Sequence, residues 1–213
     1  MEKIITMLKK IVITSVLAAT TFAITANAAL PSGLYVSGQA GYADTHMKSK
    51  LYSPKTGTAL ANDGLAGRLA IGYKLTPNFA LELGYLQLPT AKLNKRKGLL
   101  ALSNKQNAID VAAKGILPIT NNVNLYGKVG AAYLTTQLQG KYTNDSGVPI
   151  TQDLNSAEGI AKHKWAPEVA VGMGYDITKN VTVDTSFTHI QPVGNNRPGN
   201  INLLAVGVAY NFG

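Results

Sequence analysis

Three short stretches of closely similar sequence divide this chain and constrain its fold more than any other feature. They are 72–78 (Gly-Tyr-Lys-Leu-Thr-Pro-Asn), 116–122 (Ile-Leu-Pro-Ile-Thr-Asn-Asn) and 174–180 (Gly-Tyr-Asp-Ile-Thr-Lys-Asn). Proline fixes φ, and Thr and Asn side chains bond to the backbone of tight reversals, so each stretch predicts a hairpin turn. The connections between these hairpins are long and polar. Short turns at one end of the strand pairs and long loops at the other are typical of transmembrane β-barrels.

Eight segments are predicted to be β-strands, because large apolar residues alternate with small or charged ones along most of them. The strands are expected at about 34–42, 64–75, 79–88, 107–117, 123–136, 165–177, 181–191 and 201–212. In segment 64–75, for example, Leu69 and Ile71 alternate with Arg68 and Ala70. Since eight strands enclose only enough space for side chains, the small and charged residues fit the inside.

Aromatic residues support the assignment of the apolar face to the outside. When the first strand runs outward and the others follow up and down, the aromatic residues fall at two levels on that face. The outer level comprises Tyr42, Tyr85, Tyr133, Trp165 and Phe187, and the inner level comprises Tyr73, Phe79, Tyr175, Tyr210 and Phe212. Two aromatic girdles around an aliphatic band match the two interfaces of a membrane. Strands are rich in aromatic residues in any fold, but that enrichment alone does not sort them into two levels.

A hydrocarbon environment also requires the sheet to close. Every backbone N–H and C=O group there must be paired within the protein, so free sheet edges are excluded. An even number of strands places both termini on one side and lets the last strand pair with the first. The prediction is an all-β fold, an eight-stranded antiparallel up-and-down transmembrane β-barrel.

The first 28 residues have the pattern of a secretory signal. A lysine-rich start precedes the apolar run Ile11 to Ile24, and Ala26-Asn27-Ala28 fits a cleavage site. The run is shorter than the roughly 20 residues that a spanning helix needs. We therefore expect a signal peptide at 1–28 and an outer-membrane barrel at 29–213. The chain has no cysteine, so neither a lipoprotein anchor nor a disulfide is expected.

With these features the sequence resembles the small outer-membrane barrel family typified by the transmembrane domain of OmpA. The resemblance covers the whole chain after the signal. It rests on the signal, the strands, the Thr-x-Asn turns and the last strand, Val206-Gly207-Val208-Ala209-Tyr210-Asn211-Phe212. That ending is similar to the terminal strand that the barrel assembly machinery recognises in the family. The resemblance implies an integral outer-membrane protein that displays four loops and contacts outer-membrane lipid and lipopolysaccharide. The wall anchoring of the full-length type member is not expected.

Seven charged residues fall on the inward face of the predicted strands. They are Arg68, Glu82, Asp110, Lys114, Lys128, Glu168 and Asp184. Ions in a narrow interior must be paired, because an unpaired buried charge is strongly destabilising. We expect a salt-bridge network that plugs the lumen, and the type member of the family is similar in this respect. The alternative is a narrow gated pore, for which eight strands leave little space.

Positive charge is concentrated in the expected second outer loop, 89–105. This cationic loop carries Lys92, Lys95, Arg96, Lys97 and Lys105 without an acidic residue. The net charge of the chain is +9, and removal of a signal with three lysines and one glutamate leaves +7. Such a loop suits the head groups of lipopolysaccharide or external polyanions, including those of a host. The same charges can serve only to keep the loop solvated. Nucleic acid is excluded as a partner by the location.

A lipid A-modifying enzyme is the alternative from another functional class. Small barrels that deacylate lipid A carry a His-x-Ser pair near the end of a late strand, and the nearest match here is His189-Ile190-Gln191. Gln stands in the position of the nucleophile, and Ser186 falls on the opposite strand face from His189. With His46 and His163, His189 falls near the outer rim, without the spacing of metal ligands. We expect a non-enzymatic outer-membrane protein without cofactor or metal.

Overall fold

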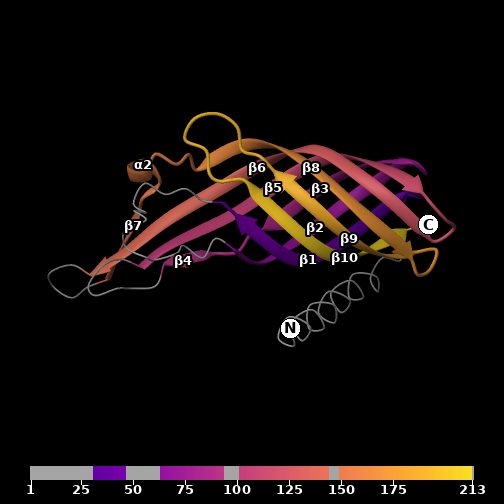
Figure 1. Cartoon of the computed structure of the whole chain (residues 1–213), viewed down its shortest axis with the longest axis horizontal. Helices are drawn as coiled ribbons and strands as arrows, with labels where there is room; N and C mark the ends of the chain where they lie inside the picture. The colour runs from indigo at the N-terminus through magenta and orange to yellow at the C-terminus, as the bar shows by residue number, and fades with distance from the viewer. Residues whose placement is uncertain (1–30, 47–62, 94–100, 144–148, 213) are drawn as a thin grey trace.

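The computed structural model describes residues 31–46, 63–93, 101–143 and 149–212, which form ten strands and one short helix (Figure 1). The elements are β1 (Leu34–Thr45), β2 (Asp63–Thr76), β3 (Phe79–Gln87), β4 (Ala91–Leu93), β5 (Ala101–Pro118), β6 (Val123–Thr143), β7 (Pro149–Asp153), α2 (Asn155–Glu158), β8 (His163–Asp176), β9 (Val181–Ile190) and β10 (Ile201–Phe212). The expected signal peptide lies outside the described residues. Within them, no helix has the length and apolarity to cross a membrane.

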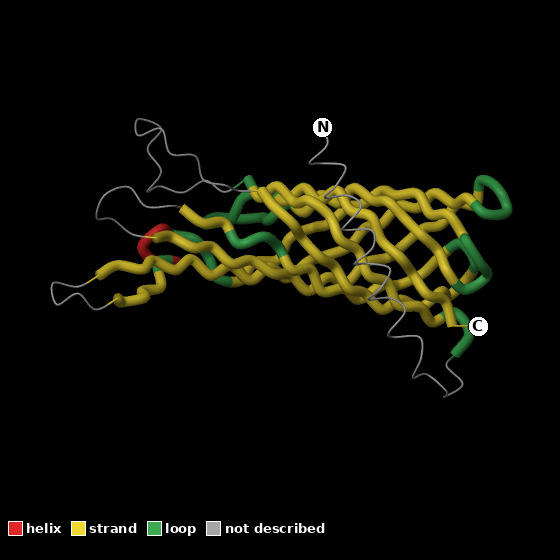
Figure 2. Tube along the Cα trace, turned by 90° about the horizontal axis from the view of Figure 1, so that it is seen from below, coloured by secondary structure: helices red, strands yellow, loops and turns green. Residues whose placement is uncertain are grey.

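Eight of these strands close into an antiparallel barrel (Figures 1 and 2). Neighbours pair in the order β5-β3-β2-β1-β10-β9-β8-β6, and a pairing between β5 and β6 completes the cylinder. The first and last strands pair in continuous register, from Leu34 opposite Phe212 to Thr45 opposite Ile201. The predicted fold class, an eight-stranded up-and-down barrel, is therefore confirmed.

The β5–β6 hairpin extends beyond the barrel at the end opposite the C-terminus (Figure 2). There β4 pairs with β5, and β7 pairs with β6. As a result β5 begins at Ala101 rather than near residue 107, and β6 ends at Thr143 rather than near residue 136. The sequence prediction stopped short because these extensions carry polar residues on both faces and lack apolar alternation.

Each repeated stretch forms a tight turn at the other, inner end of the barrel, where the C-terminus lies (Figure 2). The Thr hydroxyl of each turn accepts a hydrogen bond from the backbone N–H of the Asn two residues later. The donor–acceptor distances are 3.3 Å for Thr76 and Asn78, 3.3 Å for Thr120 and Asn122, and 3.2 Å for Thr178 and Asn180. These bonds are the side-chain-to-backbone contacts expected of Thr in a turn.

The Asn of each turn also binds the neighbouring hairpin. The Asn78 amide donates to the carbonyl of Ile116 at 3.0 Å, and the Asn78 carbonyl accepts from the Ile116 N–H at 2.8 Å. The same pair of bonds joins Asn122 to Asp176 (3.1 and 2.8 Å) and Asn180 to Asn211 (2.8 and 2.7 Å). We call these three contacts the inner-rim clasps. They connect consecutive hairpins, whereas the turns only connect strands within one hairpin.

A glycine takes the place of Asn at the fourth junction. The carbonyl of Gly33 accepts a hydrogen bond from the N–H of Lys74 at 2.8 Å. Gly33 has a φ of 97°, in the left-handed region that favours glycine. The inner rim is thereby hydrogen-bonded at all four junctions between hairpins.

Large apolar side chains cover the outside of the barrel. Ile71, Leu83 and Val171 are 46%, 51% and 63% exposed, whereas the inward-facing Arg68 and Glu82 are 4% and 2% exposed. This inverted distribution, with apolar residues outside and charges inside, is the one that a lipid environment favours.

Candidate functional site: the lumen and the outer rim

Five charged residues meet in the middle of the lumen. Arg68 on β2 contacts both Glu82 on β3 and Asp110 on β5, with N–O distances of 3.2 and 2.5 Å. Lys128 on β6 lies 2.5 Å from Glu82, and Lys114 on β5 lies 3.4 Å from its other carboxylate oxygen. Glu82 is therefore the centre of this luminal cluster and contacts three cations.

The other two predicted network residues lie apart from these ion pairs. Asp184 accepts hydrogen bonds from Gln39, at 2.8 Å, and from the hydroxyl of Tyr126. Glu168 is 3% exposed, and its Oε2 atom has no hydrogen-bond partner in the described part of the chain. The structure thus brings together five of the seven residues and leaves Glu168 and Asp184 outside the direct ion pairs.

Two tyrosines complete the luminal cluster. The hydroxyl of Tyr35 donates to Glu82 at 2.8 Å, and that of Tyr126 donates to Asp184. The Nζ atom of Lys114 lies 4.2 Å from the ring centroid of Tyr126, within cation–π range. Sequence reasoning missed both tyrosines, although Tyr126 shares the strand face of Lys128 and could have been placed inside by that alternation.

The outer half of the lumen contains an apolar layer, beside which the polar side chains of Gln106, Thr136 and Thr188 are also buried. Six large aliphatic side chains, each at most 2% exposed, form this layer with surrounding alanines: Leu86, Leu88, Leu134, Ile190, Ile201 and Leu203. We call these six residues the aliphatic seal. The sequence analysis assigned small and charged residues to the inside and did not predict this aliphatic layer.

The inner half of the lumen contains a cavity of about 220 Å³. It is lined from the inner turns, at Pro77 and Pro118, up to Glu82, Tyr126 and Lys128. We call this cavity the inner vestibule. The lumen is thus divided into an inner vestibule, a charged middle layer and an outer aliphatic seal.

Eight of the ten predicted girdle residues are at least 36% exposed on the strand surfaces. Tyr210 and Phe212 are half-buried and contact each other edge-to-face, with ring centroids 5.0 Å apart. At the outer end Tyr133 contacts Trp165 in the same way and stacks on His163 at 5.6 Å. These contacts group aromatic rings at both ends of the barrel surface.

Residues 94–100 of the cationic loop, including Lys95, Arg96 and Lys97, lie outside the described residues. Lys92 belongs to β4, and Lys105 is exposed on the outer part of β5. The third loop is held by Asn155, whose amide nitrogen donates to the carbonyl of Thr136 at 3.0 Å and whose amide oxygen accepts from the N–H of Leu138 at 2.8 Å.

One charged residue of the third loop has a perturbed pKa. A bond from Lys162 at 2.6 Å and a second from the backbone N–H of Asn155 at 3.0 Å hold the pKa of Asp153 below its usual value. Both donors stabilise the carboxylate form, so this contact strengthens as Asp153 ionises.

The three histidines lie in separate environments. His46 is 3.4 Å from Asp44, and His163 stacks on Tyr133. The ring nitrogens of His189 lie 2.6 Å from Oδ1 of Asn202 and 3.3 Å from Oε1 of Gln191. No group of three potential metal ligands occurs among the residues that the structure describes. Ser186 is buried and faces the lumen, where Gln39 donates to it at 3.3 Å.

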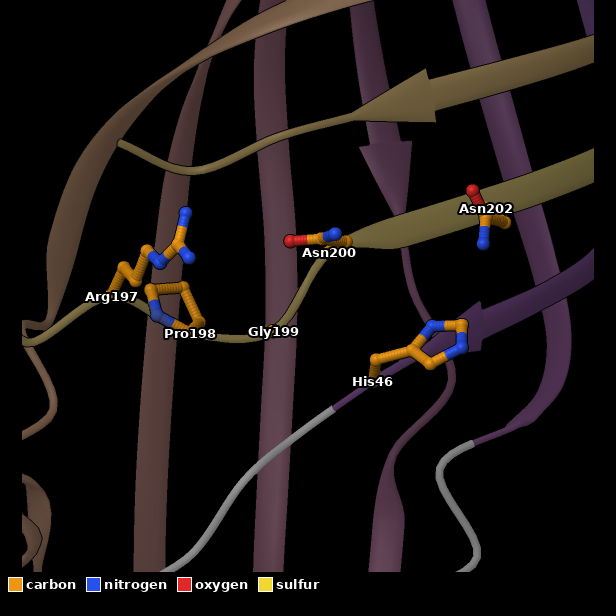
Figure 3. Close-up of a pocket in the computed structure, with 6 residues that line it drawn as sticks. All are labelled: His46, Arg197, Pro198, Gly199, Asn200 and Asn202. Atoms are coloured by element: carbon orange, nitrogen blue, oxygen red, sulfur yellow. The ribbon is translucent and has the colours of Figure 1, made fainter. Parts of the chain in front are cut away.

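A pocket of about 450 Å³ lies at the outer rim, between the end of β1 and the β9–β10 loop (Figure 3). It is lined by His46, Arg197, Pro198, Gly199, Asn200 and Asn202. The described residues of the lining offer a guanidinium, an imidazole and two amide groups, and none of them is a carboxylate. We call this site the outer-rim pocket.

Several known proteins share this architecture. Residues 31–213 match the family model described as "OmpA-like transmembrane domain". The chain is 30% identical to an uncharacterized protein of Coxiella burnetii (strain RSA 493 / Nine Mile phase I), over 85% of this chain and 86% of that protein. It is 23% identical to outer membrane protein A of Klebsiella pneumoniae over 84% of its own length, and spans about half (51%) of that protein.

Solved structures agree on the fold. Neisserial surface protein A has a TM-score of 0.54 at 20% identity, covering 85% of this chain and 98% of that one. Ail, the attachment invasion locus protein of Yersinia pestis, in complex with the heparin analogue sucrose octasulfate has a TM-score of 0.50 at 16% identity, covering 84% and 99%. Together with the closed, lipid-compatible barrel, the match over residues 31–213 shows that this chain is an integral outer-membrane protein and belongs to the OmpA-like transmembrane domain family.

Proposed function

We propose that this protein is a sealed barrel whose function lies on its outer surface, where the loops contact lipopolysaccharide and external polyanions. The observation that carries the proposal is the aliphatic seal, six large side chains at most 2% exposed. An ion or solute would have to displace these packed side chains to cross the barrel. The barrel then acts as a stable support, and the loops perform the surface function.

Polyanions are the class of partner that the surface charge favours. The cationic loop carries five basic residues without an acidic one, and Lys105 is exposed at its base. A cluster of positive charges attracts anionic partners and raises their association rates. The complex of Ail with a heparin analogue supports the same ligand class for a barrel of this architecture.

Heparin retention at graded salt tests this proposal. Replacing Lys95, Arg96 and Lys97 with Gln should make the folded barrel elute at lower salt, because three charges are lost. Lys179→Gln, on an inner turn, is the control and should elute close to the wild type. Unchanged retention of the triple variant would show that the loop is merely solvated.

Planar bilayers test the sealed lumen. The wild type should give no conductance steps, because the packed side chains of the aliphatic seal block the lumen. Regular conductance steps from purified wild-type protein would favour the gated-pore alternative and contradict the proposal.

The geometry of His189 argues against the lipid A-modifying alternative. Its ring nitrogens lie beside the side-chain amides of Asn202 and Gln191, and no serine hydroxyl is among the hydrogen-bond partners that the described residues give it. Ser186 faces the lumen and lies on the other side of the strand. Mass spectra of lipid A with and without the gene should therefore be identical. A missing acyl-chain modification would establish an enzyme.

We further propose that residues 1–28 are a cleaved export signal. Intact mass and N-terminal sequencing of protein purified from outer membranes should give Ala29 as the first residue. An intact N-terminus in the membrane fraction would contradict this.

A further inference from the structure

The outer-rim pocket is a concave site whose position is fixed by the residues around it. The β9–β10 loop, 191–200, forms one wall, and His46 at the end of β1 forms the other (Figure 3). The backbone N–H of His46 donates to the carbonyl of Asn200 at 2.9 Å, so the two walls are directly bonded. A volume of about 450 Å³ is within the range of ligand sites.

The β9–β10 loop is held at several points. Its N-terminal end is anchored by the bond from the N–H of Gln191 to the carbonyl of Pro167 at 3.0 Å, and its middle by the bond from the N–H of Ala161 to the carbonyl of Asn196 at 3.0 Å. Pro192 and Pro198 are buried. A loop with these anchors presents its polar groups in a defined arrangement, which lowers the ordering cost of binding.

Arg197 is the principal charge of the pocket. Its Nη1 atom donates to the carbonyl of Pro192 at 3.3 Å, which positions the side chain across the loop. That bond uses one of five guanidinium donors, so several remain for a ligand. Arginine binds phosphate and sulfate oxygens through paired N–H groups, and lysine does not.

Asn202 adds an oriented donor. Its Oδ1 atom lies 2.6 Å from Nδ1 of His189, outside the pocket. In Figure 3 the amide nitrogen points away from that oxygen, towards the side on which His46 lies. With Asn200 and the His46 imidazole, the pocket offers further N–H donors beside the guanidinium of Arg197. Asp44 lies 3.4 Å from His46 but is not part of the lining.

We propose that the outer-rim pocket binds a sulfate or phosphate ester group carried on a saccharide. The pocket has the donor set of an oxyanion site, and its volume suits one charged sugar unit. The cationic loop would attract the remaining sugar units of a polyanion. This inference rests on the proposed polyanion function and adds a specific site to it.

Calorimetric titration of the purified barrel with sucrose octasulfate tests the site. Arg197→Gln removes the charge and keeps much of the side-chain length, and it should weaken binding about tenfold, the scale of a lost charge-assisted hydrogen bond. Lys162→Gln is the matched control, because it removes one charge on the same side of the membrane outside the pocket. Heat-modified mobility on gels shows that each variant is folded.

The triple variant of Lys95, Arg96 and Lys97 separates this inference from the proposed function. Arg197→Gln should reduce affinity in that background by the same factor as in the wild type. Equal affinity of Arg197→Gln and the wild type, or an equal loss in Lys162→Gln, would overturn the pocket while the loop could still retain heparin. If the triple variant loses heparin retention and Arg197→Gln keeps it, the pocket is likewise overturned and the cationic loop remains the polyanion site.

The ester group can come from lipopolysaccharide or from an external saccharide, and binding measured in two kinds of membrane distinguishes these sources. In nanodiscs that contain lipopolysaccharide, the affinity for sucrose octasulfate should fall relative to phosphatidylcholine nanodiscs if the lipid's own phosphate occupies the pocket. An equal affinity in both membranes, still lost in Arg197→Gln, assigns the site to an external saccharide. The pocket is overturned if Arg197→Gln has no effect in either membrane.

Discussion

The ring of Tyr126 lies directly over Gly172, its partner on the neighbouring strand. A Cβ atom at position 172 would lie 2.3 Å from Cζ of Tyr126 and 2.6 Å from the carbonyl oxygen of Thr185. Tyr35 and Gly72 form the same pair across β1 and β2. Each glycine thus provides the space in which a luminal tyrosine reaches its carboxylate partner.

Gly172→Ala should destabilise the barrel by about 1–3 kcal/mol, because the added methyl overpacks against the ring and against backbone. Gly127→Ala is the control, since its nearest contact would be an ordinary 3.9 Å. Urea unfolding in lipid vesicles, followed by the fluorescence of Trp165, measures both. Equal stability of the two variants would show that the ring moves aside freely.

Glu82→Gln should cost about 3–5 kcal/mol, because Arg68, Lys114 and Lys128 would lose the carboxylate that they share. Glu168→Gln should cost far less, since the Oε2 atom of Glu168 has no hydrogen-bond partner among the described residues. The same unfolding measurement compares the two. A larger loss in Glu168→Gln would place the centre of the network elsewhere.

Asn122→Ala should cost about 0.5–1.5 kcal/mol by removing the side-chain half of one inner-rim clasp. Asn121, in the same turn, is exposed, so Asn121→Ala should change stability by no more than about 0.5 kcal/mol. Hydrogen exchange at the amides of β8 should also quicken in Asn122→Ala alone. Identical behaviour would mean that the backbone bond is sufficient at this junction.

Leu69→Arg should cost about 2–4 kcal/mol, because it places a charge in the lipid-facing band. Ala70→Ser, at the adjacent inward position, should be mild. The equilibrium between folded and unfolded protein in lipid vesicles gives the change in the free energy of unfolding for each variant. Equal costs would contradict the assignment of the two strand faces.

The barrel itself was predictable from the sequence, because two independent signals agree. The alternation around Leu69 and Arg68 defines two faces, and the three repeated turns divide the chain into hairpins. Lipid then selects which face is outside. The β5–β6 extension was not predictable in this way, since its outward positions, such as Lys105 and Gln137, are polar and the sequence there lacks apolar alternation.

The interior was only partly predictable. Alternation places Glu82, Arg68 and Lys128 inside but does not determine which charges meet, because that depends on strand register and tilt. Leu134 and Leu203 were not recognised as a seal because apolar residues on the inward face contradict a polar-core pattern. They are tolerated because eight strands leave a lumen narrow enough to be packed dry.

The division of the lumen makes the buried charges accessible from one side only. Solvent enters through the inner vestibule as far as Glu82, whereas Leu86 and Leu134 bar it from outside. Exchange of solvent with the Glu82 ion pairs is therefore expected through the inner vestibule rather than through the aliphatic seal. A solute that reaches the centre of this barrel has to arrive from the end that carries the short turns.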